Sequence, residues 1–125
     1  MKIRLYQINC IVDGECEDAE LMKRAVQRKF LGLDSLRKLY GSADIDPQMY
    51  ALAYDGEVDA EDLETVYQIF NVGERPAGFT GHSMSVSDIV QVMTDTAQTL
   101  HGVYFCDSIG FKRLPSGVAE VKKHA

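Results

Sequence analysis

Residue types able to do chemistry are concentrated in one short segment of the chain, residues 78–90, which reads GFTGHSMSVSDIV. A serine, a histidine and an aspartate are the components of a nucleophilic hydrolase, in which a base must reach the nucleophile and a third group must orient the base. Near neighbours along one strand cannot readily do this, because successive side chains point to opposite faces, and no GxSxG elbow is present. The other interpretation is that the hydroxyl groups satisfy backbone groups of an irregular turn, with Asp88 as a cap or turn acceptor.

A second polar segment, Asp107-Ser108-Ile109-Gly110, has the composition of a tight turn. We expect the two segments to lie side by side in adjacent strands, which would bring His82, Ser85, Asp88 and Asp107 near one another. An enzyme built there, a small hydrolase or a nucleotide- or phosphate-binding protein, would be centred on His82, Ser85 and Asp107. The small residues of the first segment could expose N–H groups to a phosphate, although neither GxxxxGK[ST] nor GxGxxG occurs.

Within the first segment, Gly81 is predicted to mark a special backbone geometry and His82 a hydrogen-bonded pivot. Alternation predicts that Ser83, Ser85 and Ser87 face one way and that Met84, Val86 and Asp88 face the other.

Metal and redox chemistry have little support in the sequence, so we expect no metal and no cofactor. The three histidines, at positions 82, 101 and 124, lack HxxxH spacing. Cys10, Cys16 and Cys106 lack CxxC spacing, which fits thiols in a reducing cytosol, and Cys10 and Cys106 are expected in or near the core.

The charge balance narrows the class of partner. The formal net charge is −6 and the pI about 4.9, which disfavours direct nucleic-acid binding through phosphate contacts. An acidic DNA mimic of the antirestriction type is an alternative, and its densest acidic cluster is Glu57, Asp59, Glu61, Asp62 and Glu64. Such a cluster is also typical of a solvated helix start. No apolar run approaches the length of a membrane span, so we expect a cytoplasmic protein without a membrane partner.

The elements that must position these residues follow from periodicity. Strands are predicted over 2–12, 49–54, 88–93 and 103–106, with a short return strand near 111–114. The apolar alternation of the first strand slips at Gln7, which predicts a bulge or an early end. Asp55-Gly56 is expected to close the second strand.

Three helices are predicted between these strands. The first begins at Asp18, ends near Gly32, and buries Met22, Ala25, Val26 and Phe30. The second is capped by Asp34, carries Leu36, Leu39 and Tyr40, and ends at Gly41. The third is capped by Asp59 and buries Leu63, Val66, Tyr67 and Phe70.

These elements predict a single α+β domain over residues 1–125, with a tail over 115–125. Its sheet is expected to be mainly antiparallel, with four to five strands and two or three helices packed on one face.

Four segments together resemble the YodL-like domain family: Phe70-Asn71, Arg75-Pro76, FTGHSMSVSDIV over residues 79–90, and YFCDSIGF over residues 104–111. The family pattern is approximately F-N, then P, then F-x-G-H-S-L-S-V-S-D-V-V, then Y-Y-V-D-S-x-G-F. This chain has Met84 in place of the family's leucine and Phe105-Cys106 in place of Tyr-Val, and both changes are compatible in size. The resemblance covers about residues 70–114.

The family is bacterial, and similar domains occur as single small proteins and as modules of large polyvalent proteins of mobile elements, often beside DNA-modifying or antirestriction-type domains. The resemblance therefore implies a non-enzymatic protein-interaction or accessory module of the bacterial cytoplasm, encoded on a mobile element, whose partner is another protein. The motif residues that it singles out, with a structural or a functional role, are Phe79, Gly81, His82, Ser83, Ser85, Ser87, Asp88, Asp107, Ser108, Gly110 and Phe111.

Overall fold

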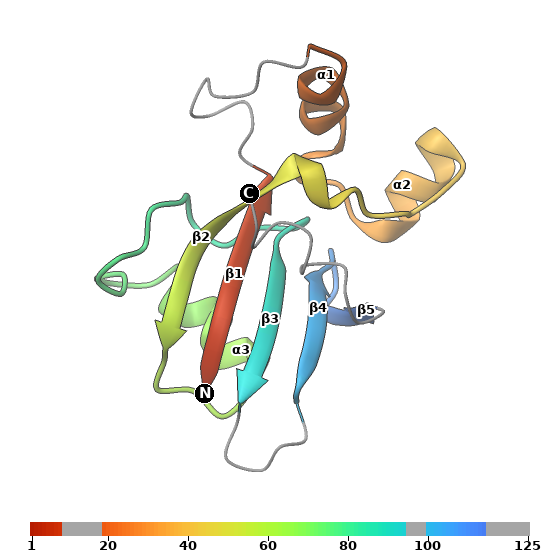
Figure 1. Cartoon of the computed structure of the whole chain (residues 1–125). Helices are drawn as coiled ribbons and strands as arrows, with labels where there is room; N and C mark the ends of the chain where they lie inside the picture. Colours follow the sequence, from red (N-terminus) through yellow and green to blue (C-terminus); the bar gives the residue numbers. More distant parts are fainter. Residues whose placement is uncertain (9–18, 95–99, 115–125) are drawn as a thin grey trace.

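A five-stranded antiparallel sheet forms the centre of the molecule (Figure 1). The computed structural model describes residues 1–8, 19–94 and 100–114. The strands, β1 (Lys2–Ile8), β2 (Tyr50–Glu57), β3 (Ile89–Thr94), β4 (Gly102–Cys106) and β5 (Phe111–Leu114), lie in the order β2-β1-β3-β4-β5. The helices are α1 (Ala19–Arg28), α2 (Leu33–Tyr40) and α3 (Leu63–Ile69), and one 3-10 turn, η1 (Pro47–Met49), precedes β2. The predicted α+β class, antiparallel pairing and number of strands are confirmed.

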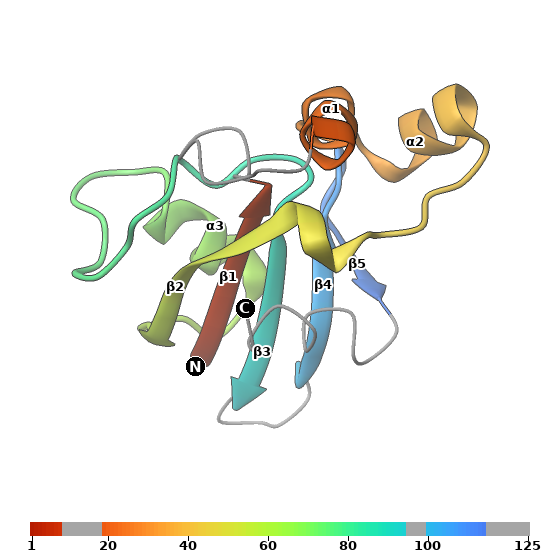
Figure 2. The ribbon, with the colours of Figure 1, turned by 45° about the horizontal axis from the view of Figure 1, so that its top comes forward.

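The helices divide between the two faces of the sheet, so the prediction that they pack on one face is wrong. Leu63, Val66 and Phe70, in and directly after α3, share one apolar cluster with Ile3 and Leu5 of β1. The buried residues of α1 and α2 share a second cluster with the β1 residues that point the other way: Leu21, Ala25, Leu33, Leu36, Tyr6 and Ile8. Figure 2 shows α3 behind the sheet and α1 and α2 beyond its end. The physical reason is that the second half of β1 places apolar side chains on both faces, Leu5 on one and Tyr6 and Ile8 on the other, and both faces must be covered there.

A β-bulge interrupts the pairing of β1 with β2. Leu5 pairs with Tyr54 but Tyr6 pairs with Leu52, so Ala53 is the extra residue and lies in β2. The sequence predicts a bulge or an early end at Gln7, and the irregularity falls one pair earlier. Residues 9–12 of the predicted first strand lie outside the described residues, as do Asp18 and the tail 115–125. The strand β2 runs through Asp55-Gly56 to Glu57 and does not close there as predicted.

The first helix differs most from its prediction. It buries Leu21 and Ala25, whereas Val26 and Phe30 are each 55% exposed. The helix ends at Arg28 because the chain turns at Phe30, which has a φ of 69°. Gly32 does not end α1 and instead occupies the N-cap position of α2.

The ends of the other helices are partly as predicted. Gly41 ends α2 in the left-handed conformation and donates its N–H to the carbonyl of Arg37. Asp62, and not Asp59, caps α3 by accepting the Thr65 N–H at 2.8 Å.

Other large apolar residues of the predicted helices are exposed. Tyr67 of α3 is 38% exposed, and Leu39 and Tyr40 of α2 are 63% and 38% exposed.

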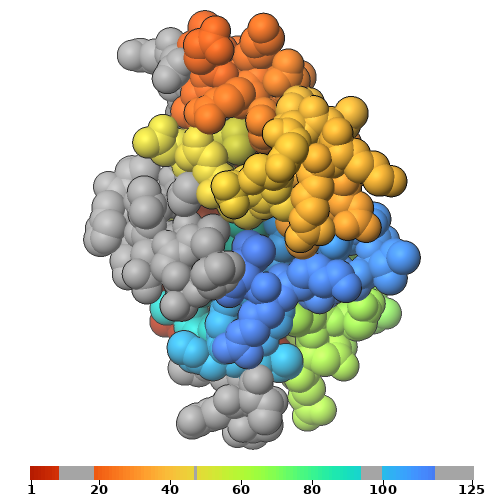
Figure 3. All heavy atoms as spheres, turned by 90° about the vertical axis from the view of Figure 1, so that its right-hand side faces the viewer, coloured from red at the N-terminus to blue at the C-terminus, as the bar shows by residue number. Residues whose placement is uncertain are grey.

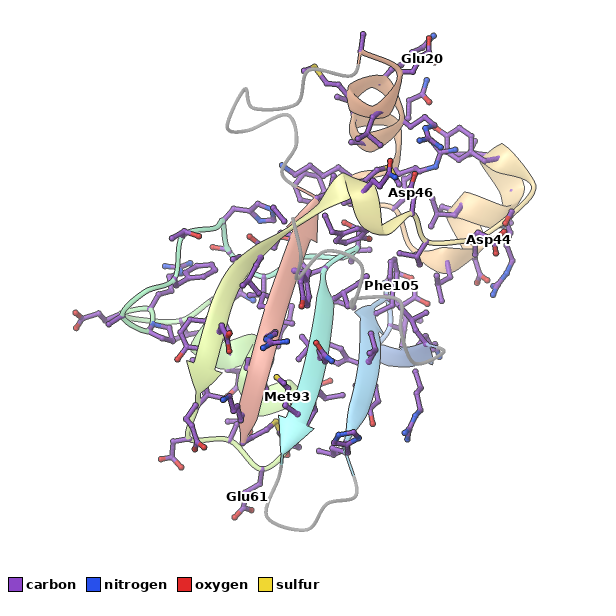
Figure 4. All side chains as sticks on the ribbon, viewed as in Figure 1. Glu20, Asp44, Asp46, Glu61, Met93 and Phe105 are labelled. Carbon is purple, nitrogen blue, oxygen red and sulfur yellow. The ribbon has the colours of Figure 1, made fainter. Side chains whose placement is uncertain are left out.

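The loop before η1 is held to α1 by an ion pair, Arg24 Nη2 to Asp46 Oδ2 at 3.0 Å, and Figure 4 labels Asp46 at that position.

Candidate functional site

The amide of Gln7 holds the first motif in place. Gln7 is fully buried, its Oε1 accepts the His82 N–H at 3.1 Å, and its Nε2 donates to the His82 carbonyl at 2.8 Å and to Asp88 Oδ2 at 2.9 Å. An amide nitrogen has two hydrogens, so the 3.4 Å approach of Nε2 to His82 Nδ1 is a contact without a hydrogen bond. The orientation of the amide is fixed, because the backbone N–H of His82 can only donate. Gln7 thus binds the backbone of the motif on both sides of one residue.

Gly81 is glycine because the Gln7 amide lies against it. A Cβ at this position would lie 1.9 Å from Gln7 Oε1 and 2.9 Å from the Cβ of Ala53. Ala53 is the bulge residue of β2, and its free carbonyl accepts the Thr80 N–H at 3.0 Å. The predicted special geometry at Gly81 is therefore a close approach between backbone and side chain. The bulge and Gln7 together place the segment 80–82 at the edge of the sheet.

Asp88 is a buried turn acceptor, as one of the two interpretations of the sequence predicted. It is 1% exposed, and its Oδ2 accepts from the Gln7 amide and from the Ser85 N–H at 2.9 Å, while its own N–H donates to the Ser85 carbonyl at 3.1 Å. Its Oδ1 is buried without a partner in the described part of the chain. Burial raises the pKa of Asp88 to about 7, against the lowering effect of the hydrogen bonds from Gln7 and Ser85 and of the Lys29 charge.

The surroundings of His82 favour its neutral imidazole form. Its Nδ1 lies 2.7 Å from the Ser83 carbonyl, so Nδ1 carries the hydrogen, and Nε2 is a buried acceptor with no partner among the described residues. Burial lowers the pKa of His82, and the Lys29 charge adds to this, against the raising effect of the hydrogen bond to Ser83. Ser85 Oγ donates to that same Ser83 carbonyl at 2.9 Å. Because both donors go to one backbone oxygen, His82 does not act as a base toward Ser85 in this arrangement.

The two motifs do lie side by side. The Ser87 N–H donates to the Cys106 carbonyl at 2.9 Å, and the Cys106 N–H donates to the Asp88 carbonyl at 2.8 Å. The carboxylate of Asp107, however, has other partners: its Oδ1 accepts the Leu33 N–H at 3.1 Å and the Ser108 N–H at 2.8 Å. The structure thus gathers His82, Ser85 and Asp88 around Gln7 and uses Asp107 to bind the first turn of α2. This is the capping role that the sequence assigned to Asp34.

The remaining motif residues also have identifiable contacts. Ser87 is buried with a φ of 86°, its Oγ accepts the Phe30 N–H at 3.1 Å, and its carbonyl accepts the Tyr50 hydroxyl at 2.7 Å. Ser83 is exposed and bonds to Arg75, and Phe79 packs edge-on against Phe70 with ring centroids 5.0 Å apart.

The predicted alternation fails at the end of this segment. Ser87 and Asp88 are both buried. The reason is that residues 85–88 form a turn, and the strand begins only at Ile89.

A cleft of about 160 Å³ opens where the second motif meets α3. Its lining comes from α3, from the first motif and from the 106–111 segment: Glu64, Tyr67, Val86, Cys106, Asp107, Ser108, Gly110 and Phe111. Figure 3 shows β5 and the turn before it on this side of the molecule, between α2 and α3. Ile109, at the tip of that turn, is 83% exposed. Cys106 is buried as predicted, and burial raises its pKa to about 12, so it is an unreactive thiol.

Within residues 1–8, 19–94 and 100–114, no three histidine, cysteine or acidic side chains converge as metal ligands, and no helix has the length and apolarity of a membrane span. In the acidic cluster of residues 57–64, Asp62 caps α3 and Glu64 lines the cleft.

Two residues of this region were missed at the level of sequence. Gln7 was visible only as a polar interruption of an apolar strand, and nothing nearby in sequence indicated its partners 75 and 81 positions later. Asn71 donates from Nδ2 to the Tyr67 carbonyl at 3.0 Å and to the Met84 carbonyl at 3.1 Å, which ties the end of α3 to the motif. Its place in the Phe70-Asn71 segment of the family pattern was the available signal.

Comparison with known protein families supports the resemblance that the two motifs indicate. The family model described as the YodL-like domain matches residues 18–116, which include both motifs and the helices α1, α2 and α3. Neither a search of curated proteins nor a search of solved structures found a match. The match extends over most of the chain, and the chain therefore belongs to the YodL-like domain family.

Proposed function

We propose that this protein is a non-enzymatic module that binds another protein through the Ile109 surface, which we define as Ile109 and the adjoining cleft residues Tyr67, Val86, Ser108 and Phe111. The observation that carries the proposal is the 83% exposure of Ile109 next to an open cleft. Exposure of a large aliphatic side chain to water is unfavourable in free energy. Exposed apolar residues beside a cleft are characteristic of binding sites.

The turn that presents Ile109 is fixed before any partner arrives. The Asp107 N–H donates to the Gly110 carbonyl at 2.9 Å, and Asp107 Oδ1 accepts the Ser108 N–H. Gly110 supports this turn with a φ of 68°. Preorganisation of this kind lowers the entropy lost on association, which favours an anchor role for Ile109.

The hydrogen-bond partners of the polar motif residues favour a binding role over catalysis. The donors of His82 and Ser85 both bond to a backbone carbonyl, and the carboxylate of Asp107 holds the start of α2. These side chains are occupied in building the loop and docking a helix. A relay from a serine through a histidine to an acid would need them to bond to one another.

The proposed setting, a bacterial cytoplasmic accessory protein of a mobile element, rests on family membership. The net charge of −6 further favours a protein partner over direct binding of nucleic acid.

Site-specific photo-crosslinking tests the proposal. A photoreactive residue is placed at position 109 in one protein and at position 72 in a matched control, since Val72 is also an exposed aliphatic residue, at 70%. In the native host, position 109 should yield a discrete crosslinked protein, and excess unlabelled wild type should compete it away whereas excess Ile109→Asp should not. The proposal fails if positions 109 and 72 give the same products, or if Ile109→Asp competes as well as wild type.

A further inference from the structure

Phe30, directly after α1, has a backbone conformation that is unfavourable for its residue type. Its φ is 69°, in the left-handed region that glycine occupies freely and large side chains rarely adopt. Helices commonly end with glycine in this conformation. Burial of the ring would offset the strain, yet Phe30 is 55% exposed. Folding alone would therefore favour glycine at position 30, which points to another role for the ring.

The first motif holds Phe30 in this position. The Phe30 N–H donates to Ser87 Oγ at 3.1 Å, and the ring packs edge-on against His82, with centroids 5.8 Å apart. The backbone of His82 is bound in turn on both sides by the Gln7 amide. A strained residue that its surroundings enforce is typical of functional positions. The motif thus presents an aromatic ring to solvent in a fixed conformation, which lowers the entropy lost when a partner packs on it.

The outward side of α1 adds a second apolar side chain. The helix buries Leu21 and Ala25 in the second apolar cluster, whereas Val26 is 55% exposed. Val26 lies four positions before Phe30 in the chain, and Lys23 lies one turn before Val26 on the same exposed side of the helix.

The charges beside Phe30 are positive although the protein as a whole is acidic. Residues 21–33 include four cations, Lys23, Arg24, Arg28 and Lys29, and no acid. Lys29 Nζ lies 5.2 Å from the centroid of the Phe30 ring. Arg24 is paired with Asp46, but in the described part of the chain no carboxylate lies within ion-pair distance of Lys23 or Lys29. Charges are screened beyond about 8 Å at physiological ionic strength, so a group that binds here responds to these lysines more than to the net charge.

We propose that Phe30, Val26, Lys23 and Lys29, which we call the Phe30 surface, dock an acidic segment of a partner protein. An apolar side chain of that segment packs on the Phe30 ring, and its carboxylates face the two lysines. The Phe30 surface shares no residue with the Ile109 surface, so this proposal does not rest on the previous one.

An anionic membrane and a nucleic acid fit the Phe30 surface less well than an acidic protein segment. A helix that binds a membrane buries its apolar face in it, whereas Leu21 and Ala25 of α1 are already buried in the protein. Nucleic-acid binding relies on several phosphate contacts, and the net charge of −6 opposes both kinds of polyanion.

NMR titration of the full chain with two synthetic peptides tests the proposal. One peptide has a leucine flanked by glutamates, and the other has lysines in place of the glutamates. The glutamate peptide should shift the amides of Lys29 and Phe30, and the lysine peptide should not. Phe30→Gly should weaken binding of the glutamate peptide by about tenfold, as expected for an aromatic anchor.

The role of charge has its own matched pair of variants. Lys29→Gln should weaken binding of the glutamate peptide, whereas Lys2→Gln should not, because Lys2 is an exposed lysine at the far end of β1 from α1 (Figures 1 and 2). Equal shifts with the two peptides, or unchanged affinity in both Phe30→Gly and Lys29→Gln, would overturn the proposal. Tighter binding of anionic lipid vesicles or of single-stranded DNA than of the glutamate peptide, at the same residues, would also overturn it.

Urea denaturation separates binding from folding. Phe30→Ala loses the ring and keeps the strained backbone, whereas Phe30→Gly loses the ring and relieves the strain. The urea midpoint of Phe30→Gly should therefore lie above that of Phe30→Ala and at or above that of wild type, although both variants lose binding. A midpoint of Phe30→Gly clearly below wild type would show that the ring serves folding, and would overturn the proposal.

Discussion

Replacement of Gln7 by leucine should be among the most damaging changes of similar size in this chain. The substitution keeps most of the buried volume but removes the partners of the His82 N–H and the His82 carbonyl, and one of the two donors to Asp88 Oδ2, which keeps the Ser85 N–H. A buried polar group left unsatisfied costs about 1–3 kcal/mol, so two such groups and the weakened Asp88 should lower the free energy of unfolding by about 2–5 kcal/mol, with some relief from rehydration. That loss is a large fraction of the 5–15 kcal/mol or so typical of a domain.

Urea denaturation followed by far-UV circular dichroism measures this loss. Gln91→Leu is the matched control, because Gln91 is a half-buried glutamine of β3 whose side chain, within the described part of the chain, has a single long bond, from the Tyr6 hydroxyl at 3.5 Å. The control should lose less than about 1 kcal/mol. A loss below about 1 kcal/mol for Gln7→Leu, or equal losses for the two variants, would refute the idea that the Gln7 amide holds the motif.

Three further predictions concern the two motifs. Gly81→Ala should lower the free energy of unfolding by about 2–4 kcal/mol, because the new Cβ would lie 1.9 Å from Gln7 Oε1. In a Gln7→Ala background the same substitution should cost clearly less, and urea denaturation measures both losses. Equal losses in the two backgrounds would contradict the clash. Asp107→Ala should lower the free energy of unfolding, measured by thermal unfolding, by about 1–2 kcal/mol. Asp107→Asn should lower it less, since asparagine keeps an oxygen acceptor for the Leu33 N–H. Identical losses would argue against this cap. Burial raises the pKa of Asp88 to about 7, against 3.8 in the unfolded chain. The free energy of unfolding of wild type relative to Asp88→Asn should therefore fall by up to about 4 kcal/mol between about pH 4 and about pH 8. A difference that does not depend on pH would contradict the buried, protonated carboxyl.

The sequence was most informative where a local pattern decides the structure. The apolar spacing of Leu63, Val66 and Phe70 identified α3, and Gly41 marked the end of α2, because periodicity and a left-handed cap are local properties. The turn signals at Asp107 and Gly110 identified the hairpin between β4 and β5 for the same reason.

The site depended on contacts that no local pattern contains. The Gln7 amide binds residues 75 and 81 positions away. Asp107 accepts the Leu33 N–H because the fold places the start of α2 beside it. The apolar face of α1 was misassigned because Phe30 looks like the next turn of the helix in sequence, whereas its bond to Ser87 draws the chain out of the helix. Side-chain rules for a strand also could not apply to Ser87 and Asp88, which belong to a turn.

The central claim is that the polar residues of the first motif form one structural network. A double-mutant cycle between Gln7 and Asp88 tests it most directly, with free energies of unfolding measured for wild type, Gln7→Ala, Asp88→Ala and the double variant at one pH. The structure predicts that the double variant loses less than the sum of the two single losses, by more than about 1 kcal/mol, since either substitution alone leaves the other side chain buried without one of its partners. Additive losses would mean that the two side chains act independently, and would return the motif to consideration as a functional site.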